Sequence, residues 1–382
     1  MTAVGARKLM FLAVVLMAAL ALVHCGKGLL TDLDPVNVHS PQWNKYFLFS
    51  ADEDAVNSYV SVYSIDTSNG KLGSTESYVS GAFNTSAFSM AIDREGKFVF
   101  IAKDGTAERW VKSYSINQVT GELQLIDAIN FNLNYSGFKL AINPRLNAVY
   151  VLYQDAANNY VSSRTYSADT GAFLSSSTIP FGGVVTSYDI GVKPDGTAVY
   201  ATCSGGFYYL PVSGEGNVTS QQLVSIFPVF GRLVVRPNNG SVFGSLSGYL
   251  AVASGISPSM LSYSLSATIT LGTNFVITGG DYLVQANTMF TSYTIGSEST
   301  PQMTEVNSVS IDAGGATTIG THPNLSYVYA FDAGAIHGVK VNPDGTLVSI
   351  GSPYSTGVAT VKALGIAITT INGPQPPSTP LN

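Results

Sequence analysis

Five aspartates lie just beyond short segments rich in Val, Tyr, Phe and Ile: Asp52, Asp54, Asp104, Asp155 and Asp332. Segments of that composition favour β-strands, so the aspartates are expected in the loops after them. Carboxylate oxygens that converge from several loops would suit Ca²⁺, and they could also act as general bases. The alternative is that they are ordinary solvated acids of surface loops. They form a candidate ligand site if the fold brings those loops together.

Other residue types that carry chemistry are scarce. Only three histidines come after the N-terminal segment, His39, His322 and His337, and none has a partner at a recognisable spacing. We find no Gly-x-Ser-x-Gly, no His-Glu-x-x-His and no Gly-x-x-x-x-Gly-Lys-Ser/Thr motif. So few His and Cys residues do not favour zinc. We therefore assign no catalytic residue and expect no metal or cofactor, with Ca²⁺ at the aspartates as the one exception to test.

Residues 1–24 have the features of a bacterial export signal. Arg7 and Lys8 form a positively charged start, and an uncharged apolar run continues from there as far as Val23. This run is about 15 residues long, shorter than the ~20 residues that a membrane-spanning helix needs. The pattern predicts that the rest of the chain is exported.

The end of this signal resembles a bacterial lipobox. Leu22-Val-His-Cys25 places a Leu three positions before a Cys, which in a lipobox is diacylated and becomes the mature N-terminus. His24 departs from the small residue usual before that Cys, so two alternatives stay open: cleavage after Ala21 with release as a soluble secreted protein, or an uncleaved anchor. We expect lipid on Cys25 and a lipidated tether over residues 25–38. All three alternatives place the chain in the cell envelope or beyond it, outside the cytoplasm.

The composition excludes two classes of partner. Charged residues make up 11% of the chain and the formal net charge is −6, against roughly 25% charged residues in typical soluble domains. An acidic chain without Lys/Arg clusters lacks the electrostatic footprint of a nucleic-acid binder. It also lacks a basic patch for anionic lipid headgroups. Contact with a membrane is expected through the lipid on Cys25 alone.

A degenerate repeat runs through the chain. Its copies contain Pro or an equivalent residue, then a turn, then a pair such as Val-Tyr, as in Gly191-Val-Lys-Pro-Asp-Gly-Thr-Ala-Val-Tyr200. The Pro-equivalent positions are 41, 94, 144, 194, 237, 278 and 323, which lie 41 to 53 residues apart. Seven copies of this length fit the four-stranded blades of a β-propeller.

Each copy is succeeded by a second strand and turn, such as Ser113-Tyr-Ser-Ile116 before Thr120-Gly-Glu-Leu123. Alternating apolar residues make a strand with one buried face, and Gly supplies the positive φ of a tight turn. Lys362–Ile368 resembles a first strand with no second strand after it. We expect it to close the ring as the inner strand of the first blade, whose other strands come from residues 45–80.

The predicted fold class is therefore all-β: a seven-bladed β-propeller of four-stranded antiparallel blades over residues 39–370, with a flexible Pro-rich tail over 371–382. Such a fold would carry the loops between the second and third strands of each blade to one rim. The five aspartates would then surround the mouth of the central channel. Aromatic residues near them could stack on a glycan or fill the core: Tyr59, Trp110, Tyr153, Tyr160, Phe207 and Tyr208.

The Pro-Asp-Gly turn, the Val-Tyr strand, Ser-Tyr-Ser-Ile and Thr-Gly-x-Leu resemble the lactonase-type, 6-phosphogluconolactonase-like seven-bladed propellers over roughly residues 40–370. The resemblance implies the fold, and it implies a lactone hydrolase that uses the upper-face carboxylates as one function. This chain is poor in the His, Arg and Glu that such a site would contain. We therefore favour an exported, lipid-anchored module that binds a protein or glycan partner and is not an enzyme, with the carboxylic ester hydrolase as the alternative.

Overall fold

The structure is a computed structural model that describes residues 43–53, 57–82, 87–182, 187–225, 232–237, 241–246, 249–254, 262–270, 274–296, 303–311, 315–322, 326–332, 334–356 and 360–371. The chain divides into two units. One comprises residues 1–44 and 370–382, of which only the ends of two strands are described. The other, Lys45–Thr369, contains the body of the strands and all the candidate site residues that the structure describes.

Every described element is a β-strand, and the strands pair into antiparallel sheets. Six sheets each use one continuous stretch of chain. The first three are β4 (Ala87–Ile92), β5 (Phe98–Asp104), β6 (Arg109–Ile116) and β7 (Leu123–Asn130); β8 (Ser136–Ile142), β9 (Ala148–Gln154), β10 (Asn159–Tyr166) and β11 (Phe173–Phe181); and β12 (Ser187–Val192), β13 (Ala198–Cys203), β14 (Gly206–Pro211) and β15 (Gln222–Ser225).

The next three continue in the same order along the chain. They are β16 (Leu233–Val235), β17 (Val242–Leu246), β18 (Tyr249–Ser254) and β19 (Ser262–Thr270); β20 (Phe275–Ile277), β21 (Tyr282–Ala286), β22 (Met289–Ile295) and β23 (Met303–Ser310); and β24 (Thr318–Thr321), β25 (Tyr327–Asp332), β26 (Ala335–Val341) and β27 (Leu347–Ser349), with the short β28 (Tyr354–Ser355) also on β26.

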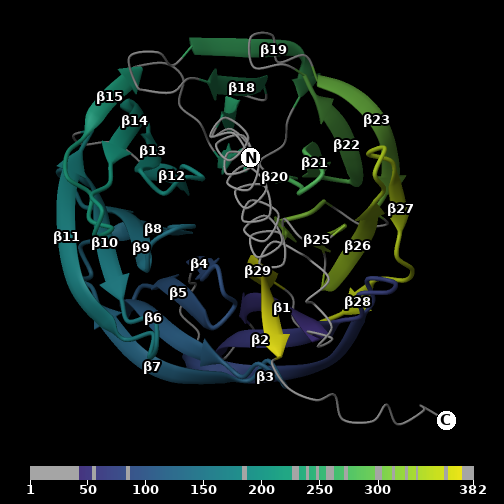
Figure 1. Ribbon diagram of the computed structural model, residues 1–382, viewed down its shortest axis with the longest axis horizontal. Helices are drawn as coiled ribbons and strands as arrows, with labels where there is room; N and C mark the ends of the chain where they lie inside the picture. Colours follow the sequence, from purple (N-terminus) through teal and green to yellow (C-terminus); the bar gives the residue numbers. More distant parts are fainter. Residues whose placement is uncertain are drawn as a thin grey trace, which may run out of the picture. The chain divides into compact units, whose positions relative to one another are not determined.

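A seventh sheet joins the two ends of the repeat region. Its order is β29 (Thr360–Ile371), β1 (Trp43–Glu53), β2 (Asn57–Ile65) and β3 (Leu72–Ala82). Lys362–Ile368 therefore lies in the strand beside β1, which confirms the predicted closure by a C-terminal strand. Figure 1 shows β4, β8 and β12 nearest the centre of this unit and β7, β11 and β15 at its circumference. The all-β class and the propeller of four-stranded antiparallel blades are confirmed.

The repeat residues explain how neighbouring blades pack. Gly121 has φ +79°, and a Cβ placed there would lie 2.6 Å from Phe47 of the preceding sheet. Gly70 repeats this contact across the closure, because its Cβ would lie 2.6 Å from Tyr327. Only glycine tolerates both the positive φ and the close approach. The Thr-Gly and Asn-Gly turns thus let each blade rest on the one before it.

The core consists of apolar side chains between adjacent sheets. Phe47 and Phe49 of β1 pack with Val99 and Ile101 of β5 in one such cluster. On the other side of the same sheet, Leu48 and Tyr63 pack with aromatic residues of β25. Strands buried on both faces read as continuous apolar runs, which is why the second strand of each blade is so hydrophobic.

Candidate functional site

Asp104 at the end of β5 is a structural residue of its own sheet and the next. Its Oδ1 accepts a hydrogen bond from Arg109 Nε at 2.8 Å, and its Oδ2 accepts one from the Gly137 backbone N–H at 2.7 Å. The two side chains are only 14% and 15% exposed. Arg109 also donates to the Leu133 carbonyl. Both oxygens of Asp104 are therefore engaged in holding the sheet of β4–β7 against that of β8–β11.

Asp155 lies in the turn between β9 and β10 and organises that turn. Its Oδ1 accepts hydrogen bonds from the backbone N–H groups of Ala157 and Asn158, both at 2.7 Å. Its Oδ2 accepts one from the Tyr160 hydroxyl at 2.8 Å. The two backbone donors and the hydroxyl, in that order, lower the pKa of Asp155. A carboxylate held in this way is a weak general base.

Asp332 ends β25 and is 4% exposed. Its Oδ2 accepts a hydrogen bond from the Gly315 backbone N–H at 3.2 Å, just before β24. Of the remaining candidates, Asp52 lies in β1 opposite Tyr59 in the backbone register. The Asp52 side chain, Asp54 and Cys25 lie outside the described residues, as do residues 1–42.

The described acids do not gather into a metal site. Among the described residues, no group of three or more His, Cys, Asp or Glu side chains could hold a metal ion. Asp104, Asp155 and Asp332 belong to three different sheets, and each is bound within its own loop or to a neighbouring strand. The grouping of these three aspartates around one ligand stays a prediction. The same part of the chain contains no helix long and apolar enough to cross a membrane.

Most of the aromatic residues near these loops belong to the core. Trp110, Tyr153, Phe207 and Tyr208 are all buried. Tyr160 is half-buried and stacks on Tyr153, with ring centroids 5.3 Å apart. The core assignment therefore holds for four of the six, and Tyr59 and Tyr160 are partly buried.

A charged cluster around Trp110 was not identified from the sequence. Lys103 is completely buried, and its Nζ lies 2.6 Å from Glu108 Oε1. Lys112 Nζ lies 4.1 Å from the centre of the Trp110 ring, a distance suited to a cation–π contact. The available signal was a lysine that ends the otherwise apolar run Phe98–Lys103. β5 is buried on both faces from Phe98 to Lys103, so this lysine lies inside the protein.

The charges of this cluster offset one another. Burial acts to raise the pKa of Glu108, but the hydrogen bond from Lys103 and the nearby Lys112 hold it below its usual value. Burial lowers the pKa of Lys112, and Glu108 opposes that shift. Glu108 is thus ionised and paired at neutral pH. The cluster lies within the sheet of β4–β7, and its carboxylate is paired with Lys103.

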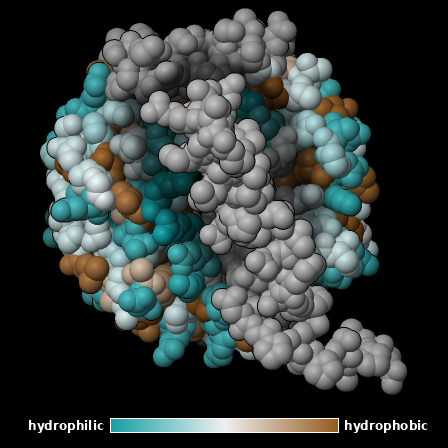
Figure 2. All heavy atoms as spheres, in the orientation of Figure 1, coloured by the Kyte–Doolittle hydropathy of each residue, from teal (hydrophilic) through white to brown (hydrophobic). Residues whose placement is uncertain are grey.

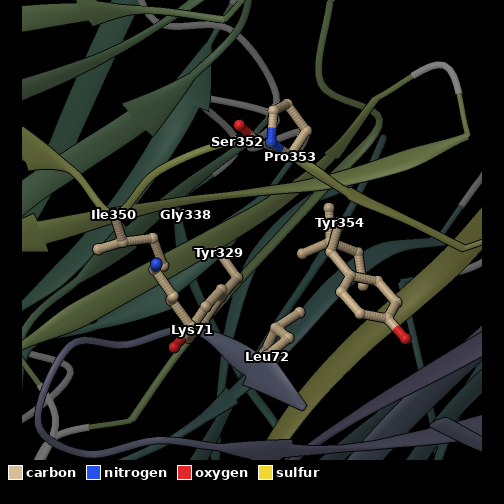
Figure 3. Close-up of a pocket in the computed structure, with 9 residues that line it drawn as sticks. Lys71, Leu72, Tyr329, Gly338, Ile350, Ser352, Pro353 and Tyr354 are labelled. Atoms are coloured by element: carbon tan, nitrogen blue, oxygen red, sulfur yellow. The ribbon is translucent and has the colours of Figure 1, made fainter. Parts of the chain in front are cut away.

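A cavity of about 220 Å³ lies between β3 and the outer edge of β26. We call it the Tyr354 pocket, and Figure 3 shows its lining, with Lys71 and Leu72 opposite Ser352 and Pro353. Its lining residues are Lys71, Leu72, Tyr329, Ile336, Gly338, Ile350, Ser352, Pro353 and Tyr354. Lys71 is the one charged residue among them. The pocket therefore combines an exposed cation with apolar and aromatic walls.

An interruption of the fourth strand opens this pocket. β27 pairs with Val339–Val341 of β26, and β28 pairs with Ala335 and Ile336. Ile350 still donates its N–H to the Gly338 carbonyl at 3.2 Å, and the chain bulges out at Gly351–Pro353, with Gly351 at φ +119°. A Cβ on Gly338 would lie 2.2 Å from Ile350 Cδ1, so glycine at 338 lets the Ile350 side chain fold onto the strand. Bulges of this kind often occur beside functional sites.

A second depression of about 390 Å³ lies among three turns of the repeat. It is lined by Ile142, Pro144, Arg145, Val192, Pro194, Val235 and Pro237. Exposed large apolar side chains elsewhere on the described residues include Leu174 and Val119. On the face drawn in Figure 2, brown side chains are scattered among teal and white ones. Single exposed apolar residues are normal and do not mark an interface.

Comparison with known proteins places the fold but not the activity. No protein-family profile matches the sequence, and no curated protein is significantly similar to it. The chain is similar in structure to a candidate 6-phosphogluconolactonase from Bacteroides fragilis, with 14% identity and a TM-score of 0.67, covering 85% of this chain and 98% of that one. A periplasmic gluconolactonase from Pseudomonas aeruginosa gives 12% identity and a TM-score of 0.67, covering 85% and 99% of the two chains.

A candidate 6-phosphogluconolactonase from Bacteroides uniformis gives 14% identity, a TM-score of 0.66, and coverage of 85% and 99%. Identities this low establish a shared fold alone, because a propeller hosts many unrelated functions. The chain therefore has the propeller architecture of 6-phosphogluconolactonase-like proteins.

Proposed function

We propose that this chain is a non-catalytic binding module that engages a protein or glycan partner outside the cytoplasm, held at a bacterial membrane by lipid on Cys25. The support for a binding role is the hydrogen bonding of the three described candidate carboxylates. Asp104, Asp155 and Asp332 all accept hydrogen bonds from their own loop or sheet neighbours. A general base needs a carboxylate within reach of a substrate proton and able to take it. Hydrogen bonds from the protein's own groups already engage all three, which supports a binding role over general-base catalysis.

The support for a location outside the cytoplasm is the N-terminal pattern of Arg7, Lys8 and the apolar run that ends at Cys25. One structural neighbour is a periplasmic protein, which agrees with this location. The anchor is tested by labelling cells with radioactive palmitate and comparing wild type with Cys25→Ala. We expect label in wild type only. An unlabelled wild type would show that the chain carries no lipid.

Lactone hydrolysis is the second candidate, and the names of three structural neighbours favour it. The purified chain is incubated with gluconolactones while acid release is monitored with a pH indicator. We expect the spontaneous rate. The non-catalytic proposal would be overturned by wild-type hydrolysis above that rate, if the excess is lost in Asp52→Asn, Asp104→Asn or Asp155→Asn. Lys71→Met is the control and should keep that excess.

The binding role is tested with the immobilised chain and a panel of purified envelope and matrix polysaccharides and proteins. We expect saturable binding to at least one member, unaffected by Asp155→Asn. Absence of saturable binding to every member, by a chain that unfolds cooperatively, would contradict the proposal.

A further inference from the structure

We propose that the Tyr354 pocket binds one ring of an acidic saccharide, with the sugar carboxylate on Lys71. The inference rests on the proposed binding function and specifies its site and the chemical class of its ligand.

The size of the cavity sets the size of the ligand. Its volume is about 220 Å³, below the roughly 300 Å³ at which pockets for drug-sized molecules begin. One six-membered sugar ring is of the right order to fill it, and the rest of an oligosaccharide would extend into solvent. A single aspartate or glutamate side chain of a peptide is a short linear group and would leave most of the apolar wall uncovered. Uncovered apolar surface contributes nothing to affinity.

The charge of the lining sets the charge of the ligand. Lys71 is exposed, and none of the other eight lining residues is ionised at neutral pH. Asp66 is an acid that Lys71 influences, but its pKa is lowered mainly by hydrogen bonds from Ser68 and only in small part by Lys71. Among the described residues, no carboxylate forms an ion pair with Lys71. On a chain of net charge −6, an isolated positive pocket favours an anionic ligand.

The remaining lining matches the mixed surface of a sugar. Leu72, Ile336 and Ile350 supply apolar contact for the C–H groups of a ring, and Ser352 supplies a hydroxyl that can donate and accept. Tyr354 adds an aromatic wall that combines an apolar body with a polar tip. A neutral sugar would use these walls but not Lys71. The lining therefore predicts preference for a uronic-acid ring over its neutral counterpart.

Contacts with the rest of the fold hold the side chains that line the pocket in place. The Tyr354 ring meets Tyr63 edge-on, with centroids 5.3 Å apart and planes at 82°. The Tyr329 hydroxyl donates to the Gly70 carbonyl at 2.7 Å, which holds the turn that carries Lys71. A Cβ built on Gly351 would lie 3.7 Å from Lys71 Cε, so the lysine stem runs along the bulge. Preorganised walls reduce the entropy lost on binding.

The test uses calorimetric titration of the purified chain with galacturonic-acid oligosaccharides and with matched galactose oligosaccharides. We expect the acidic series to bind at least tenfold more tightly, with an advantage that shrinks as salt is raised. Lys71→Met should remove that advantage and Lys71→Arg should restore most of it. Tyr354→Ala should weaken both series. Lys340→Met is the matched control, because it removes an exposed lysine of β26 that does not line the pocket, and it should change neither series.

Four outcomes would overturn the inference. Equal affinity of both series in wild type would remove the role of the charge. Acidic binding that survives both Lys71→Met and Tyr354→Ala would place the ligand elsewhere. Binding only to proteins on the panel would refute the sugar ligand while leaving the binding module intact. Saturable binding to nothing on the panel would refute the proposed function as well, so the two failures are distinguishable.

Discussion

Asp104→Ala is expected to destabilise the chain strongly and to leave ligand binding intact. The substitution removes the ion pair with Arg109 and the acceptor of the Gly137 N–H. Breaking a buried pair costs about 3–5 kcal/mol. Both side chains keep about 15% exposure and Arg109 keeps the Leu133 carbonyl, so the lower end applies. We expect a loss of about 3 kcal/mol in the free energy of unfolding.

Urea denaturation monitored by tryptophan fluorescence measures this loss as a lower midpoint with an unchanged slope. Glu95→Ala is the matched control, because the Glu95–Lys97 pair is about half exposed at both ends and should contribute roughly 1 kcal/mol or less. Equal midpoint shifts for the two variants would refute the assignment of Asp104 as a buried structural carboxylate. Loss of ligand binding at full stability would refute it too, because Asp104 would then contact the ligand.

Two further predictions concern pH and the repeat turns. Burial lowers the pKa of His322 to about 4, against ~6.5 in an unfolded chain. The unfolded state therefore binds more protons between these pH values, and the free energy of unfolding falls as pH drops from about 6.5 to 4. The loss is at most about 3 kcal/mol, and it is reduced because the side chain is partly exposed. Comparing urea midpoints at pH 7 and pH 4 should show a smaller drop for His322→Gln than for wild type; identical drops would contradict the shift. Gly121→Ala combines a positive φ with a clash against Phe47 and should lower the free energy of unfolding by about 2–4 kcal/mol. Gly214→Ala is the control and should be nearly neutral, because no atom lies within 4 Å of its new Cβ. A neutral Gly121→Ala would show that the turn does not pack on the neighbouring blade.

The chemistry of the candidate site was only partly predictable. Asp155 lies in a loop as expected, whereas Asp104 and Asp332 are the last residues of β5 and β25. Their partners, Gly137 and Gly315, could not be predicted from residue types. The Lys103–Glu108 pair and the Tyr354 pocket were missed altogether. The pocket depends on how β27 and β28 divide one edge of β26, and no short motif records such a division.

The amino-acid sequence by itself determined the all-β class, the blade repeat and the closing strand at Lys362–Ile368, because these depend on local rules. Alternation selects a strand, glycine permits a turn, and a repeat of 41 to 53 residues sets the blade length. Tertiary structure alone decided which charges are neutralised and where a cavity remains. Those properties depend on distances between side chains far apart in the chain, such as Arg109 to Leu133 or Lys71 to Tyr354. A carboxylate in a loop becomes a base, a metal ligand or a structural anchor according to the donors that the fold places around it.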